Sequence, residues 1–244
     1  MSKQERAVRT RKLLIASAAR AFYEHGYTRT SLTTVSSRVG VSSGALYFHF
    51  ENKAALATAV EAEASSALRA VTRRACRSRN SSLQALIDTT HGLAELLRTS
   101  IVAKAGFQLN SGDFEGPRVN LRDEWWECVQ RLLSGASREH ALDPGLPRRA
   151  IASSIVAATV GFEVLSRSDQ EWLSRESVTG FWQLQLPCLT APGVAGRLDP
   201  SGTGPSGTGP AGTGPAGIGP VGTGPATVPG RAASRPDPAP IAGS

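Results

Sequence analysis

Apolar residues recur at helical spacing along most of the chain, and one stretch near the N-terminus is the most informative. Leu32, Val35 and Val39 recur at offsets of three and four, which predicts a short helix with one apolar face. Gly40 is expected to end that helix, because glycine readily adopts the left-handed backbone that closes helices. Ser42 is then placed to cap a second helix by accepting a backbone amide. Two helices therefore meet across a tight turn, as in a helix-turn-helix.

The same periodicity predicts further helices before and after this hairpin. An upstream helix over roughly residues 7–25 carries apolar residues on one face, and residues 1–8 are expected to be a mobile basic arm. Helices are also predicted over residues 53–71, 83–102, 121–140, 148–167 and 170–189. Because every predicted element is a helix, we expect an all-α fold.

The composition changes abruptly after about residue 195. Residues 201–225 are five consecutive five-residue units, mostly of the form small-Gly-Thr-Gly-Pro. Such units carry too few apolar side chains to bury a core, and their glycines increase the entropy of the unfolded chain. We therefore expect a three-helix helix-turn-helix domain over residues 1–53, with the hairpin at about 31–50. A larger helical domain over 54–195 and a disordered tail over 196–244 are expected to follow.

The positive charge of the chain is concentrated in the segment that contains the hairpin. The whole chain has a formal net charge of +7. Nine Lys or Arg residues stand against three Glu in residues 1–53, a net charge of +6, whereas residues 54–195 have equal numbers of each sign. An excess of cations on a helix-turn-helix is typical of a surface that binds nucleic-acid phosphates.

Several other classes of protein are disfavoured by the sequence. The four histidines have no metal-binding spacing, and we find neither a Gly-rich phosphate loop nor a nucleophile signature, so we expect no enzyme, metal or cofactor. The odd number of cysteines, Cys76, Cys128 and Cys188, leaves no complete set of intramolecular disulfides, which favours the reducing cytoplasm. No long apolar run predicts a signal peptide or a membrane span.

A set of fixed spacings over residues 14–56 resembles the DNA-binding domain of the TetR family of bacterial regulators. The matching positions are Ala18-Ala19, Phe22, Gly26-Tyr27, Thr30-Ser31, Gly40-Val41-Ser42, Gly44, Leu46-Tyr47, His49-Phe50 and Lys53. The resemblance implies that the second helix of the hairpin enters the major groove of double-stranded operator DNA. It also implies an effector-binding and dimerisation domain behind the DNA-binding domain.

The candidate DNA contacts come from the residues and from this resemblance. Hydroxyls, free amides and a close backbone approach are expected at the start of the second hairpin helix, and Ala45 is suited to a thymine methyl. The resemblance adds phosphate contacts by Tyr47 and His49 and a backbone clamp by Lys53. The full candidate set is Thr33, Thr34, Arg38, Ser42, Ser43, Gly44, Ala45, Tyr47, His49 and Lys53. Leu46 and Phe50 are expected in the core.

The predicted helices 148–167 and 170–189 are candidates for a dimer interface. Small residues at Ala157, Ala158 and Gly161 allow close helix approach, and in the TetR family the last two helices pair across a twofold axis. A dimer would bind a palindromic site with half-sites about 34 to 36 Å apart or a multiple of this. Alternatively, these helices only close the core of the monomer.

Adjacent Trp125 and Trp126 are the candidate ligand contacts of the second domain. Residues 122–126 and 161–166 resemble the γ-butyrolactone receptor branch of the family, which carries a pocket tryptophan on this helix. Neighbouring helical residues point about 100° apart, so one indole faces the core while the other lines a cavity. Which indole does so stays open at this point.

These features together predict a cytoplasmic homodimeric repressor of secondary metabolism that a small-molecule effector releases from its operator. The effector is a γ-butyrolactone in true receptors of this branch. True receptors of this branch tend to be acidic, whereas the related pseudo-receptors, which often respond to antibiotics or intermediates, tend to be basic. By this comparison the chain, with its pI near 9.9, resembles a pseudo-receptor. The alternative is a DNA-binding dimer whose second domain senses no ligand.

Overall fold

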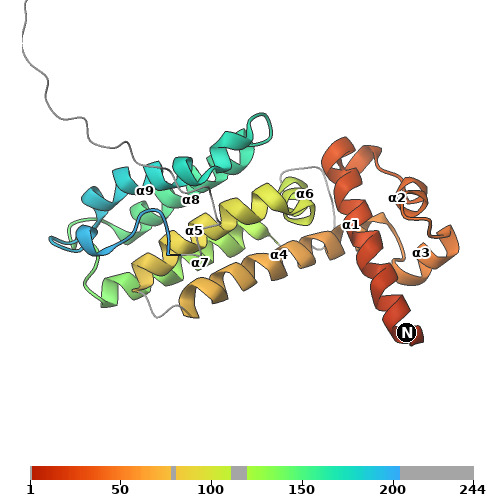
Figure 1. Cartoon of the computed structure of the whole chain (residues 1–244), viewed down its shortest axis with the longest axis horizontal. Coiled ribbons are helices and arrows are strands. Elements are labelled where there is room, and N and C mark those ends of the chain that lie inside the picture. The colour runs from red at the N-terminus through yellow and green to blue at the C-terminus, as the bar shows by residue number, and fades with distance from the viewer. Residues whose placement is uncertain (1, 78–80, 111–119, 204–244) are drawn as a thin grey trace, which may run out of the picture. The chain divides into compact units, whose positions relative to one another are not determined.

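A computed structural model of the chain describes residues 2–77, 81–110 and 120–203. Within these ranges the protein is built from helices and contains no strand, which confirms the all-α prediction. The α-helices, labelled in Figure 1, are α1 (Lys3–Arg29), α2 (Leu32–Arg38), α3 (Ser43–His49), α4 (Lys53–Arg77), α5 (Ser82–Thr99), α6 (Ile101–Leu109), α7 (Leu121–Arg138), α8 (Arg148–Leu165) and α9 (Arg175–Leu189). Two short 3₁₀ helices, Gln170–Leu173 and Ala195–Arg197, complete the described part.

Helices α1, α2 and α3 form the head of the molecule, and their apolar faces meet in one cluster. Leu14, Phe22, Val35, Leu46 and Phe50 are all at most 3% exposed. The burial of Leu46 and Phe50 confirms that both belong to the core. The head cluster also includes residues from the first turns of α4 and from α6.

The first helix begins earlier than expected. Residues 1–8 were predicted to be a mobile arm, and this is wrong for the described residues, because α1 starts at Lys3. Ser2 Oγ accepts the amide of Glu5 at 3.1 Å, and Glu5 Oε2 accepts the amide of Ser2 at 2.7 Å. This reciprocal capping box satisfies two amides that a helix start otherwise leaves unpaired.

Helices α4 to α9 build the second core, and α4 runs continuously from the head into it (Figure 1). Helix α6 lies against both parts, since Ala105 and Leu109 join the head cluster while Ala103 and Phe107 join the second. Gly106 makes this close packing possible, because a Cβ there would lie 2.6 Å from Ala64 Cβ on α4.

The chain stays ordered beyond the predicted start of the tail. Residues 191–203, here called the C-terminal strap, lie along α5, whose side chains bond the backbone of the strap. Gln84 makes two hydrogen bonds to the backbone of Asp199, at 2.8 and 3.0 Å, and His91 Nε2 lies 2.9 Å from the carbonyl of Pro200. The prediction of disorder is therefore wrong for residues 196–203, and the rest of the predicted tail lies outside the described residues.

Candidate nucleic-acid interface and ligand site

The two hairpin helices are short, and each begins at a serine that caps it. Ser31 Oγ accepts the amide of Thr34 at 3.1 Å, and Ser42 Oγ accepts the amide of Ala45 at 3.2 Å. Gly40, at a φ of +65°, supplies the left-handed residue in the turn between them. A seven-residue helix has little stability of its own, so these caps and the buried Leu46 hold α3 in place.

Helix α3 turns one face toward solvent. Ser42, Ser43, Gly44 and Tyr47 are exposed, Ala45 is half-buried, and a side chain at Gly44 would meet nothing within 4 Å. These residues share an open face on which a duplex could approach the backbone closely.

Phe48 is 81% exposed on the same helix, and sequence reasoning had missed it. Leu46 and Phe50 are four residues apart and both face inward, so Phe48 between them had to face outward. Its ring contacts His49 edge to face at 5.2 Å. His49 is half-buried and also lies against the ring of Phe50, at 6.4 Å.

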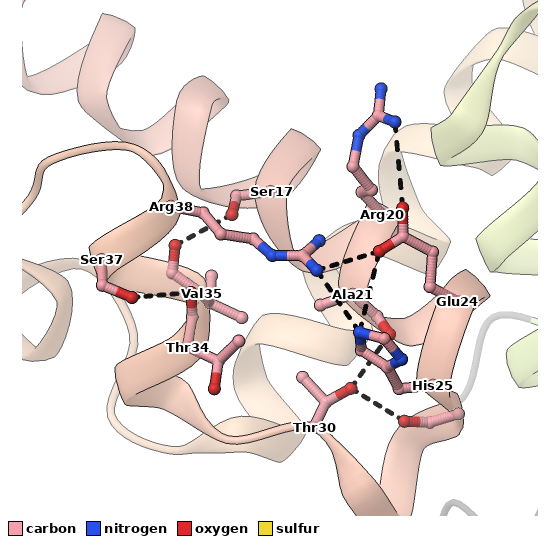
Figure 2. A network of polar contacts seen from close by, with 11 residues as sticks. Ser17, Arg20, Ala21, Glu24, His25, Thr30, Thr34, Val35, Ser37 and Arg38 are labelled. Carbon is pink, nitrogen blue, oxygen red and sulfur yellow. Dashed lines mark hydrogen bonds and ion pairs between the residues drawn. The ribbon is translucent and has the colours of Figure 1, made fainter.

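Helix α2 is fastened to α1 by polar contacts, shown in Figure 2. Ser17 Oγ donates to the carbonyl of Val35 at 2.8 Å, and Arg38 Nη2 donates to Glu24 Oε2 at 2.9 Å. Arg38 Nη2 also lies 3.3 Å from His25 Nε2. Arg38 was predicted to reach phosphate or a base edge, but in this structure its guanidinium ties α2 to α1. Thr33 and Thr34 stay exposed.

Lys53 has a role inside the head that the sequence did not reveal. Its ammonium donates to the carbonyls of Tyr27, Thr28 and Thr30 at 3.0, 3.2 and 3.1 Å and lies 4.4 Å from the centre of the Tyr27 ring. An ammonium has three protons, and three carbonyls accept them. In this structure the ammonium therefore clamps the start of α4 to the end of α1, and the predicted clamp on the DNA backbone stays a prediction.

The two candidate indoles occupy different environments. Trp125 is fully buried, and its Nε1 donates to Thr159 Oγ1 on α8 at 2.7 Å. Trp126 is only partly buried and packs at the edge of the second core. Trp125 is thus the indole that faces the interior of the domain.

A small cavity lies beside Thr159. It has a volume of about 10 Å³ and is lined by Thr90, Leu93, Ala94, Leu97, Thr159, Phe162, Leu173 and Val178. This space is about large enough for one water, so it is too small for a small-molecule effector in the present conformation. Thr159 and Phe162 are lining residues that sequence reasoning had not singled out.

Charged side chains connect α7 to its neighbours on both sides. Glu124, next to Trp125, accepts a hydrogen bond from Ser65 Oγ at 2.6 Å and pairs with Arg69 at 2.9 Å, both on α4. Glu163 on α8 is buried and pairs with Arg122 on α7 at 3.4 Å and with Arg167 at 2.7 Å. The helix that carries Trp125 is therefore linked to α4, which continues into the head.

The last two long helices expose apolar side chains. Val164, Leu165, Trp172 and Leu184, on or between α8 and α9, are between 41% and 77% exposed. The smaller residues Ala157, Ala158 and Gly161 are exposed or half-buried on α8. This is the surface that the sequence predicted as a dimer interface.

Neither a metal centre nor a membrane span emerges from the described part of the chain. No group of three or more His, Cys, Asp or Glu side chains there is arranged to hold a metal ion. In the same residues, no helix combines the length and the apolar character needed to span a bilayer.

Comparison with known protein families covers both parts of the molecule. Residues 14–60 match the family described as bacterial regulatory proteins, tetR family. Residues 80–191 match the tetracyclin repressor-like C-terminal domain. The A-factor receptor protein of Streptomyces griseus is 32% identical over 204 residues, which cover 83% of this chain and 71% of that protein. The regulator TtgR of Pseudomonas putida is 46% identical over 57 residues, only 23% of this chain and 27% of its own length.

Solved structures of related proteins share the fold. CprB from Streptomyces coelicolor A3(2) superposes with a TM-score of 0.69 at 28% identity, over 80% of this chain and 96% of CprB. A structure of CprB in complex with its biological operator sequence gives a TM-score of 0.67 at 29% identity, over 79% of this chain and 94% of that one. TylP from Streptomyces fradiae gives 0.63 at 33% identity, over 82% and 87% of the two chains.

Proposed function

The chain belongs to the TetR family of bacterial regulatory proteins, and we propose that it represses transcription by binding a palindromic operator as a homodimer. The observation that carries this proposal is the capped helix-turn-helix, whose second helix exposes Ser43, Gly44 and Tyr47 on a head of net charge +6. The likeness to a protein solved with its operator supports it.

The proposed contacts with DNA lie on the exposed surface of α2 and α3. Hydroxyls of Thr33, Thr34, Ser43 and Tyr47 are suited to phosphate oxygens, and Gly44 permits close approach. Ser42, Ala45 and His49 complete the surface. Arg38 and Lys53 are proposed to act indirectly, since their cationic groups hold α2, α1 and α4 together.

Dimerisation is proposed to involve α8 and α9. Their exposed side chains, Val164, Leu165, Trp172 and Leu184, provide apolar surface that a second copy can bury. One head contacts too few bases to select an operator, so two heads related by a twofold axis explain how the protein could recognise a palindrome.

The effector is proposed to bind between α5, α7 and α8, where Trp125 and Thr159 meet. A γ-butyrolactone has the apolar body and the carbonyl acceptor that an indole face and these polar groups can bind, and a protein of similar structure is a γ-butyrolactone receptor. The basic composition favours an antibiotic-like effector instead. Either ligand must widen the cavity of about 10 Å³ and so displace its lining residue Thr159. The hydrogen bond from Trp125 would pass this displacement to α7, and the contacts of Glu124 would pass it on to α4.

Substitution of Tyr47 tests the DNA interface. Tyr47 is 57% exposed, so replacing it should leave the fold intact. We expect Tyr47→Ala to weaken operator binding about tenfold or more, because a hydrogen bond to a charged group contributes about 1.5 to 3 kcal/mol. Tyr47→Phe separates the hydroxyl from the ring. Unchanged gel-shift affinity for Tyr47→Ala would remove Tyr47 from the interface.

A second candidate function is a DNA-binding dimer that senses no ligand at Trp125, and the small volume of the cavity beside Thr159 favours it. Tryptophan fluorescence, titrated with butyrolactones and antibiotics, separates the two functions. A saturable change that is lost in Trp125→Phe supports an effector site at this indole. A flat response to every compound supports the ligand-free dimer.

A further inference from the structure

The first three turns of α1 extend beyond the core of the head. The first buried side chain of the helix is Leu14, so residues 3–13 are held only by the continuation of the helix and by contacts at its edge. We call residues 3–12 the basic overhang. Lys3, Arg6, Arg9, Arg11 and Lys12 are all exposed, and Glu5 is the single acidic residue among them.

This distribution of charge opposes helix stability. The N-terminal end of a helix carries a partial positive charge, so cations there are unfavourable and acidic residues are favoured. Lys3, Arg6 and Arg9 also follow one another at i, i+3 spacing, at which like charges repel. The single acid, Glu5, already serves the capping box. Lys3, Arg6 and Arg9 are therefore better explained by an anionic partner than by the stability of the helix.

A contact with α3 places the overhang beside the recognition helix. The guanidinium of Arg11 lies 5.1 Å from the centre of the Phe50 ring, and Phe50 is the residue that ends α3. The overhang continues from this contact toward Lys3 for eight residues, about 12 Å at 1.5 Å per residue. Figure 1 shows the N-terminal end of α1 projecting on the side of the molecule where α3 lies.

We propose that the basic overhang binds the phosphates of operator DNA outside the segment read by α3. This inference rests on the proposed function and adds a second, sequence-independent contact to it. Lys3, Arg6 and Arg9 span about 9 Å along the helix, and duplex DNA has one phosphate per about 3.4 Å of each strand. The overhang can therefore neutralise two or three phosphates per chain. Because the capping box already forms the helix, binding need not order a flexible arm.

The test is the salt dependence of operator binding by the full chain. Plotted as the logarithm of the binding constant against the logarithm of the salt concentration, operator binding has a negative slope. In the variant Lys3→Gln/Arg6→Gln/Arg9→Gln this slope should become less steep by about 0.9 for each phosphate that the protein no longer neutralises. For a dimer with two overhangs we expect the magnitude of this slope to decrease by about 4 to 5. Affinity for random DNA should fall in parallel, since phosphates carry no sequence information. Arg11 is left in place because it packs on Phe50.

A matched control removes the same charge elsewhere. Arg73, Arg74 and Arg77 are exposed in the last turns of α4, at the end far from the head, and their replacement by Gln should leave the slope unchanged. The melting temperature of the overhang variant should not fall, because the substitutions remove a cation at the helix start and the repulsion between like charges at i, i+3 spacing.

Three outcomes would overturn the inference. These are an unchanged slope in the overhang variant, an equal change in the α4 control, or a changed dimer mass with an unchanged slope, which would make the overhang a contact between copies of the chain. If the unaltered protein binds no operator at all, the proposed function fails first, and that result is distinct from these three.

Discussion

For Lys53 and Arg38, the sequence shows a positive charge near the helix-turn-helix but does not show which groups each side chain binds. Both are cations near a helix-turn-helix, and both were predicted to contact DNA. In the structure Lys53 bonds three carbonyls at the end of α1, and Arg38 pairs with Glu24. Those acceptors lie 14 to 26 residues away along the chain, so no local pattern could have identified them. By contrast, the burial of Leu46 could be predicted, because it depends only on which face of the helix the residue occupies.

The role of Lys53 gives a prediction about stability. Lys53→Met keeps the length of the side chain but removes its donors, and three carbonyls are then deprived of a charged partner. We expect a decrease of about 1 to 3 kcal/mol in unfolding free energy, measured by urea denaturation. The exposed Lys12→Met is the control and should change stability little. If Lys53→Met lowered DNA affinity while leaving the unfolding free energy unchanged, Lys53 would be a DNA contact.

At the scale of elements, the sequence predicted most helices and misplaced several ends. The helix predicted over 121–140 is α7, and the helix predicted over 148–167 is α8. A single helix predicted over 83–102 is instead α5 and α6, because Ser100 caps the second of them by accepting the amide of Ala103 at 3.2 Å. The segment 170–189 is likewise divided at Ser174. Apolar periodicity continues across such caps, so it cannot locate them.

The cap of α3 gives a prediction at this scale. Ser42→Ala removes the acceptor for the amide of Ala45, and caps of this kind contribute about 1 kcal/mol. Because α3 has only seven residues, we expect a decrease of that size in unfolding free energy together with weaker operator binding. Ser43→Ala, one residue inside the helix, is the matched control for stability. Equal stability of the two variants would contradict the capping role.

At the scale of the whole molecule, the C-terminal strap was the part least accessible to sequence analysis. Most of its residues are small or turn-forming, which is typical of a loop, and its two larger apolar residues, Val194 and Leu198, are too few to predict that it packs against the second core. They are ordered because Gln84, Asp88 and His91 of α5 and Arg175 of α9 bond the backbone of the strap. Such contacts join residues more than a hundred positions apart, as between Gln84 and Asp199. The change in composition near residue 195 marks where the repeats approach, but it cannot reveal such long-range contacts.

The strap makes stability depend on pH through His91. Burial is the main cause that lowers the pKa of His91 below its usual 6.5, with Arg175 acting in the same direction and Pro200, Asp88 and Asp199 opposing it. The unfolded chain therefore binds this proton more readily, so stability is lost as pH falls below about 6.5. His91→Gln keeps a donor for Pro200 without the titration. We expect it to flatten the dependence of the melting temperature on pH between about 6.5 and 5, and an unchanged profile would contradict the assignment.

The central claim is that two copies of this head, joined through α8 and α9, bind one palindromic operator. The most direct test is genomic footprinting of the purified full-length protein, combined with the mass of the complex that it forms on a bound site. We expect protected inverted repeats whose half-sites are about 34 to 36 Å apart, or a multiple of this, with chains bound in pairs. A monomeric protein that binds genomic and random DNA equally well would contradict it.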